Sequence, residues 1–200
     1  EIFSRSDGVV TICGGKYTTC RSMAMEALNT FLRVTKTWRK GQPTKCRTSR
    51  VPLKEAVGLE KFGKVLSAQQ RLVKLYGVDA DQAEHFLRTY GNRAGNHLEA
   101  FEATADGMKR LVDGLPYVWG DVDAAVREGF ARTTSDVLRR RTRVFFLAPD
   151  QGKAIAEDVS KRIGELLERD TTWVLRDQER YLAEIEEGAQ RVELEDCLIE

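Results

Sequence analysis

The stretch Gly8-Val9-Val10-Thr11-Ile12-Cys13-Gly14-Gly15-Lys16-Tyr17-Thr18-Thr19 decides how the first part of the chain folds. Its first half is rich in β-branched residues, which is typical of a strand. Two glycines end that run, and apolar residues at helical spacing follow them, namely Met23, Ala24, Ala27, Leu28, Phe31 and Leu32. The sequence therefore predicts one buried strand, a glycine turn and a helix from about Tyr17 to about Val34.

The turn between strand and helix is suited to an anion. Glycines let the backbone approach a ligand, and the amides at a helix N-terminus attract negative charge. Lys16 and the hydroxyls of Thr18 and Thr19 add hydrogen-bond donors. A tight turn with threonine caps explains the same residues equally well. Neither a Walker A loop nor G-x-G-x-x-G is present in the sequence.

The remainder of the chain has a helical pattern. Residues 41–52 lose periodicity and contain Gly41, Pro43 and Pro52, which indicates a linker. We therefore expect a first segment over residues 1–40, a linker over 41–52 and a helical domain over 53–200. Breaks at five places predict at least five helices: Tyr76-Gly77, Tyr90-Gly91, Leu115-Pro116, Ala148-Pro149-Asp150 and Arg169-Asp170-Thr171. The fold class is mainly α.

Four amphipathic runs define the later helices. The first is predicted from Leu98 to Val112, and the second begins with Asp121 and Asp123, whose carboxylates suit the positive end of a helix dipole. The apolar stripe of that second helix is predicted to continue through five residues, Val126, Phe130, Thr134, Val137 and Leu138. Ile155 to Leu167 and Trp173 to Ile185 form the last two. We expect Trp119 and Trp173, at helix ends, to pack in a core or between domains.

Composition excludes several classes of protein. The 200 residues include 32 Lys plus Arg, 31 Asp plus Glu and 42% hydrophobic residues, which is typical of a globular chain and not of a disordered one. A net charge of +1 gives no basic excess for nucleic acid, which is not an expected partner. No apolar run approaches the roughly 20 residues that span a bilayer. Four cysteines at unrelated spacings predict reduced thiols of a cytosolic protein and no metal site.

Several polar groups have simple structural explanations. We interpret the basic run Arg139–Arg143 as a solvated or interdomain helix face, with Asp136 pairing with Arg139. We expect His85 and His97 to be structural, since neither has ligand partners at metal-binding spacing. Two Asp-x-Asp pairs, at Asp79 and at Asp121, lack the later positions of a calcium loop and are better explained as helix caps.

Three blocks, in order along the chain, carry a family resemblance. Asp7–Ala24 contains G-G-K-Y-T-T-C-R-S-M-A, Tyr90–Ala94 reads Y-G-N-R-A, and Ala125–Arg143 contains D-V-L-R-R-R-T-R. They resemble the G-G-K-x-T-T-Y-R-x-M-A, Y-G-x-x-A and D-V-L-x-R-R-T-R patterns of FAD-linked glycerol-3-phosphate dehydrogenases. The resemblance implies that residues 1–40 are the C-terminal strand and helix of an FAD-binding α/β domain. Cys20 stands where that family has Tyr.

The resemblance implies an enzyme that oxidises sn-glycerol 3-phosphate to dihydroxyacetone phosphate through FAD, with quinone as electron acceptor. Gly14, Gly15, Lys16, Thr18 and Thr19 would then lie beside the flavin, and Lys16 is the candidate catalytic residue. Its cation could pair with the substrate phosphate or stabilise the reduced flavin. A glycerophosphate oxidase that uses oxygen, or a helical assembly module without chemistry of its own, are the alternatives.

We expect this chain to be the C-terminal portion of that enzyme, because the N-terminal nucleotide fingerprint is absent. Alone it is expected to bind no FAD tightly and to be inactive. Its expected partners are the N-terminal FAD domain and, in one arrangement, a second copy in a homodimer. The expected location is cytoplasmic, peripheral at the inner face of the cell membrane. The first strand should be disordered, paired with another chain or covered by a helix.

Overall fold

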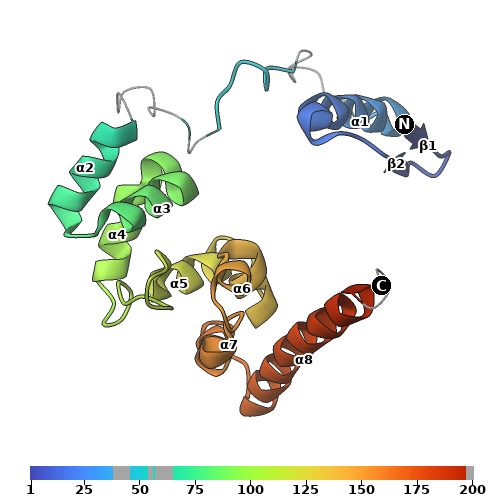
Figure 1. Ribbon diagram of the computed structural model, residues 1–200. Helices are drawn as coiled ribbons and strands as arrows, with labels where there is room; N and C mark the ends of the chain where they lie inside the picture. Colours follow the sequence, from blue (N-terminus) through green and yellow to red (C-terminus); the bar gives the residue numbers. More distant parts are fainter. Residues whose placement is uncertain (38–45, 54–55, 57–64, 197–200) are drawn as a thin grey trace. The chain divides into compact units, whose positions relative to one another are not determined.

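The computed structural model describes residues 1–37, 46–53, 56 and 65–196. The chain divides into two compact units, Glu1–Val57 and Gly58–Glu200 (Figure 1). Part of the predicted linker, residues 41–45, lies outside the described residues.

The first unit is a hairpin with one helix against it. Strands β1 (Ile2–Ser4) and β2 (Val10–Ile12) pair antiparallel, with Phe3 opposite Thr11. A 3-10 turn, Tyr17–Thr19, leads into α1 (Cys20–Thr35), which contacts both strands (Figure 1). The predicted helix after the glycine turn is confirmed.

The prediction of a single buried strand is wrong. β2 has its partner in the same chain, and Val9 and Ile12 remain about half exposed. Gly8, at φ 89°, allows the chain to reverse between the strands, and the Arg5 amide donates to the Val9 carbonyl over 2.9 Å. The sequence left three outcomes for this strand: disorder, pairing with another chain, or cover by a helix. The structure shows the last of these, since α1 contacts both strands. A three-residue partner strand is too short to leave a period in the sequence.

The second unit is helical. Its helices are α2 (Val65–Tyr76), α3 (Ala80–Tyr90), α4 (Ala94–Glu102), α5 (Trp119–Arg127), α6 (Val144–Leu147), α7 (Ala156–Leu166) and α8 (Thr171–Asp196). The predicted breaks at Tyr76-Gly77 and Tyr90-Gly91 coincide with the ends of α2 and α3. Asp79 caps α3 as predicted, since its carboxylate accepts the Gln82 amide. A helical domain after a strand fragment is confirmed as the fold class.

Helix α5 contributes to both hydrophobic clusters of this unit. Ala124 of α5 packs on α2, α3 and α4 around Phe86 and Leu98. Val118, the residue that precedes α5, belongs to the same cluster. Val122 and Val126 of α5 pack on the elements from α6 to α8, around Tyr181. Trp119 and Trp173 lie against this second cluster, as the sequence predicts. Because α5 lies between two cores, its polar side chains are drawn into the interior.

Two predicted helices are interrupted. The run Leu98–Val112 leaves the helix at Glu102, and a series of tight turns follows. Gly107 allows the first of these turns, since a Cβ there would lie 2.2 Å from the Phe101 carbonyl oxygen. The predicted stripe from Val126 to Leu138 is broken at Phe130, which takes φ 57° and exposes 76% of its surface. The apolar spacing in the sequence thus continues past the residue at which the chain reverses, and it does not mark one continuous helix.

After that reversal a π-helical segment, Asp136–Arg141, carries the basic run. Asp136 pairs with Arg140, at 3.1 Å, and not with Arg139 as predicted. Arg139 instead lies 4.5 Å above the Phe145 ring and 3.9 Å from Glu184. The wider turn of a π-helix changes which side chains meet, so the i,i+3 spacing of an α-helix no longer applies.

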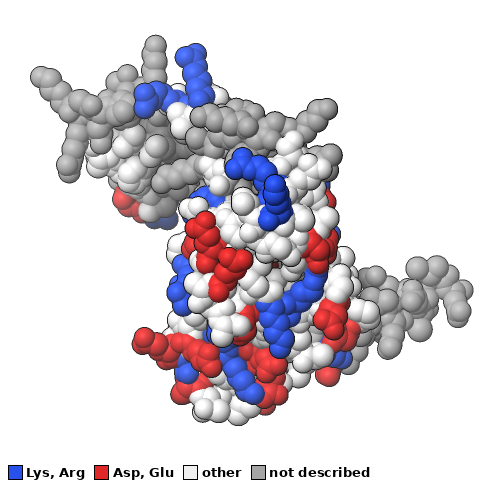
Figure 2. All heavy atoms as spheres, turned by 90° about the vertical axis from the view of Figure 1, so that its left-hand side faces the viewer, with Lys and Arg blue, Asp and Glu red and all other residues white. Residues whose placement is uncertain are grey.

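The surface in Figure 2 shows Lys and Arg interspersed with Asp and Glu. None of the helices in the described part of the chain combines the length and apolar character needed to cross a membrane.

Candidate functional site

The predicted site residues lie together on the turn before α1. Gly14 and Gly15 have φ values of 79° and 133°, and Lys16 follows in extended conformation. The Lys16 carbonyl accepts the amide of Thr19 at 3.0 Å and its hydroxyl at 3.1 Å. Thr19 therefore closes the turn, but its side chain accepts no amide of α1, so the threonine cap that the sequence left open is not formed.

The same turn presents free donors. In the described residues, no group accepts a hydrogen bond from the N–H of Gly14, Gly15 or Lys16, and the Lys16 ammonium and Thr18 hydroxyl also have no partner there. All five predicted residues are exposed. Consecutive unpaired amides, two of them at positive φ, next to a cation offer hydrogen-bond donors to negative charge. The turn thus fits one edge of an anionic or carbonyl-rich cofactor such as a flavin nucleotide.

Gly15 is expected to be less replaceable than Gly14. The backbone of Gly15, at φ 133°, is one that L residues rarely adopt, and a Cβ there would in addition displace the flexible Met23 methyl, which lies 2.5 Å away, whereas a Cβ at Gly14 meets nothing within 4 Å. Gly15→Ala should therefore destabilise this unit by about 1–3 kcal/mol, and Gly14→Ala by about 1 kcal/mol. Hydrogen exchange of the α1 amides measures both. Equal exchange in the two variants would show that the backbone conformation of Gly15 does not constrain the turn.

Cys20, which replaces the family tyrosine, begins α1 as an exposed thiol. Cys13 and Cys46 are also free thiols, and Cys197 lies outside the described residues. No group of three or more metal-ligating side chains occurs among residues that the structure describes.

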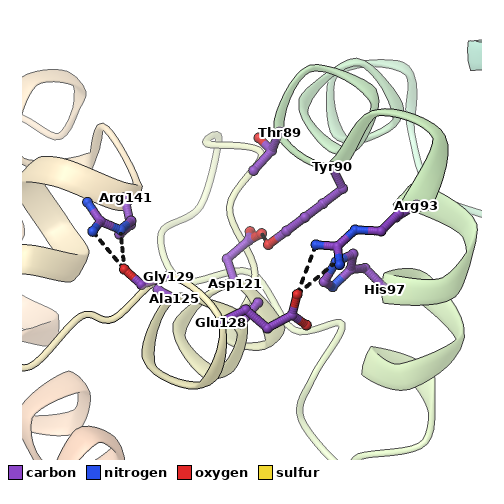
Figure 3. Close-up of a pocket in the computed structure, with 10 residues that line it drawn as sticks. Thr89, Tyr90, Arg93, His97, Asp121, Ala125, Glu128, Gly129 and Arg141 are labelled. Carbon is purple, nitrogen blue, oxygen red and sulfur yellow. Dashed lines mark hydrogen bonds and ion pairs between the residues drawn. The ribbon is translucent and has the colours of Figure 1, made fainter. Parts of the chain in front are cut away.

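A second polar site, which the sequence did not predict, lies between α3, α4 and α5 (Figure 3). It is a cavity of about 210 Å³ beside Tyr90 and Asp121. The Asp121 carboxylate is 4% exposed and accepts the Tyr90 hydroxyl at 2.5 Å. It also accepts the Val118 amide at 2.9 Å and lies 3.0 Å from His85 Nε2. One buried carboxylate thus joins α3 to the start of α5.

The protonation states at this site follow from burial. Burial, with the Asp121 charge beside it, raises the pKa of Tyr90 far above its ordinary value, so the phenol remains a donor. His97 stacks on Tyr90 with ring centroids 4.0 Å apart, and burial lowers its pKa. Its Nε2 lies 3.8 Å from Glu128, which Arg93 contacts at 2.9 Å. At neutral pH the imidazole of His97 is therefore uncharged.

The opposite wall of the cavity is formed by Arg141. Its Nε and Nη2 both donate to the Gly129 carbonyl, at 3.0 and 2.7 Å (Figure 3). That clamp holds the chain reversal after α5 in place. His85 contacts Asp121 and His97 stacks on Tyr90, and Asp121 is a buried hydrogen-bond centre in addition to an N-terminal helix residue. Tyr90 and Asp121 are 31 positions apart, so no local sequence pattern predicts their contact.

Residues 46–173 match the family described as the C-terminal domain of alpha-glycerophosphate oxidase. This match spans well over half of the chain. The chain belongs to this family. The pocket beside Tyr90 and the clamp of Arg141 both lie within the matched domain.

The curated relatives that this chain matches are much longer than the chain itself. A probable mitochondrial glycerol-3-phosphate dehydrogenase of Dictyostelium discoideum is 35% identical over 80% of this chain and 24% of its own length. A mitochondrial glycerol-3-phosphate dehydrogenase of Arabidopsis thaliana is 31% identical over 96% of this chain and 30% of its own. The chain thus spans about a quarter of the length of these relatives.

The fold has a solved counterpart. A glycerol-3-phosphate dehydrogenase from Bacillus halodurans, complexed with FAD, matches 92% of this chain and 36% of its own with a TM-score of 0.72. Its sequence identity to this chain is 23%, so the likeness concerns the fold.

Proposed function

We propose that these residues are the C-terminal portion of an FAD-dependent dehydrogenase that oxidises sn-glycerol 3-phosphate to dihydroxyacetone phosphate and passes electrons to quinone. The observation that carries the proposal is the alignment with the Arabidopsis thaliana dehydrogenase, which is long enough to include the turn Gly14–Thr19. The FAD in the Bacillus halodurans structure and the unpaired amides of this turn support it.

The bound flavin would supply a hydride acceptor. The chain itself offers the N–H groups of Gly14, Gly15 and Lys16 as donors toward the cofactor edge, with the Thr18 hydroxyl beside them. Thr19 holds this turn in shape through its two hydrogen bonds to the Lys16 carbonyl. The exposed Lys16 ammonium would stabilise negative charge that develops on the cofactor or pair with the substrate phosphate. Lys16 is therefore our proposed catalytic residue.

Lys16→Ala tests this role in the complete polypeptide that carries the flavin domain. We expect kcat to fall about a hundredfold, the loss typical of one preorganised electrostatic group, while flavin absorbance remains. Lys74→Ala is the matched control, since Lys74 is an exposed lysine of α2. A dye-linked assay with glycerol 3-phosphate measures the change.

The same variant separates the enzyme from a helical assembly module. If the module alone explains the chain, Lys16→Ala changes only stability or assembly. Turnover equal to that of the Lys74→Ala control would therefore reject the catalytic role. Peroxide release in place of quinone reduction would identify oxygen as the acceptor and favour an oxidase.

We further propose that residues 1–40 complete the FAD domain, that 41–52 link it to the helical domain over 53–200, and that this chain alone is inactive. Only one edge of a cofactor site is available on the turn. Flavin retained after dialysis of the 200-residue chain would contradict the last point. Light scattering of the complete protein tests for a homodimer, and fractionation tests for peripheral attachment at the inner face of the cell membrane.

A further inference from the structure

A second cavity in the helical unit is lined by none of the residues proposed for the flavin site. It measures about 400 Å³ and is lined by side chains of α3, by the Pro116-Tyr117 turn, and by Arg141 and Arg143. The turn Gly14–Thr19 belongs to the other unit of the chain. Anion binding in this cavity can therefore be tested with residues other than those of the flavin turn.

The lining carries three arginines and two carboxylates, and the carboxylates are already paired. Glu84 lies 2.7 Å from Arg88, and Asp81 lies 3.4 Å from Arg110. Within the described residues, neither Arg141 nor Arg143 has a carboxylate at ion-pair distance. Two cations that line one cavity thus lack a compensating carboxylate among the residues that the structure describes.

The donors at the cavity are partly fixed in place. Arg141 is oriented by its two hydrogen bonds to the Gly129 carbonyl, which leave its other N–H groups for a ligand. Thr89 adds a hydroxyl, which lies 3.2 Å from His85 Nδ1. His85 is in turn held by the buried carboxylate of Asp121. The hydroxyl and one guanidinium are therefore preorganised.

We propose that this cavity binds a phosphate-class anion between Arg141, Arg143 and Thr89. A planar guanidinium matches the oxygens of a phosphate group with two parallel hydrogen bonds. A doubly charged oxyanion would neutralise the two free cations. A soluble phosphate ester and a lipid headgroup share this chemistry, and the experiment distinguishes them.

Calorimetric titration of the 200-residue chain with inorganic phosphate tests the site. We expect saturable binding that Arg143→Gln weakens about tenfold, since a charge-assisted bidentate contact is lost. Arg180→Gln, which removes the same charge from an exposed position of α8, should leave binding unchanged. Arg143→Lys keeps the charge but loses the planar guanidinium with its two parallel donors, so this variant should bind phosphate with intermediate strength.

A parallel measurement uses vesicles of phosphatidylcholine with and without phosphatidylglycerol. Binding to the anionic vesicles that Arg143→Gln removes would assign the anion to a headgroup. Phosphate binding without vesicle binding would assign it to a soluble ester. If wild type shows no saturable phosphate binding and no Arg143-dependent vesicle binding, the proposal is wrong. Equal weakening by Arg143→Gln and Arg180→Gln would also overturn it, and circular dichroism verifies that each variant is folded.

Discussion

Asp121→Ala is expected to lower the free energy of unfolding of the helical unit by about 3–5 kcal/mol. The substitution leaves the Tyr90 hydroxyl and the Val118 amide buried without their acceptor. It also removes the partner of His85 Nε2. Each unsatisfied buried group costs about 1–3 kcal/mol. Urea denaturation followed by circular dichroism measures the loss.

Two further variants check the origin of that effect. Asp113→Ala removes an exposed carboxylate from the same unit and should change stability by less than about 0.5 kcal/mol. Tyr90→Phe removes only one of the hydrogen bonds and should cost about 1–2 kcal/mol. If Asp121→Ala is no more destabilising than Asp113→Ala, the carboxylate does not hold α3 to α5.

The second large effect is expected at Asp177 on α8. Its carboxylate is 4% exposed and accepts the amide of Thr134 at 2.9 Å and the hydroxyl at 2.7 Å. Ser160 on α7 approaches the same oxygen at 3.2 Å. Asp177→Ala should cost about 3 kcal/mol, because the buried Thr134 groups lose their acceptor. Differential scanning calorimetry would register it as a lower Tm.

Glu179→Ala is the matched control for Asp177→Ala, since it removes an exposed carboxylate from the same helix. We expect its Tm to stay close to that of the wild type. The Asp177→Asn variant retains an acceptor oxygen and should lose less stability than Asp177→Ala. The same Tm for Asp177→Ala and Glu179→Ala would show that Thr134 finds another acceptor.

Helix ends were predictable where local chemistry decides them. Gly77 follows α2 at φ 64°, and Asp79 supplies the cap of α3. These signals act over three or four residues, which is the range of a sequence pattern. The chain reversal at Phe130 depends instead on Arg141, twelve positions from the carbonyl that it clamps. A bulky residue at positive φ has no sequence signature.

The turn Gly14–Thr19 and the site at Asp121 also differ in how far apart in the sequence their residues lie. The donors of the turn Gly14–Thr19 are close together in the sequence, so the sequence alone could predict that they lie on one turn. Their role in flavin binding stays a prediction. Asp121 could be assigned to a first helical turn, but burial between two clusters gives it a second function as the acceptor for Tyr90. Such contacts arise from tertiary packing, on which periodicity carries no information.

Helix α8 has a consequence for how the protein is made. The family match ends at residue 173, in the first turn of α8, yet Asp177, Tyr181 and Ile185 belong to the interior of the helical unit. A nascent chain on the ribosome that has reached only residue 173 cannot close this interior. The unit must therefore wait, with the apolar surface around Leu138 and Ile163 uncovered, until the later turns of α8 emerge. During that interval the uncovered apolar surface makes the chain prone to aggregation.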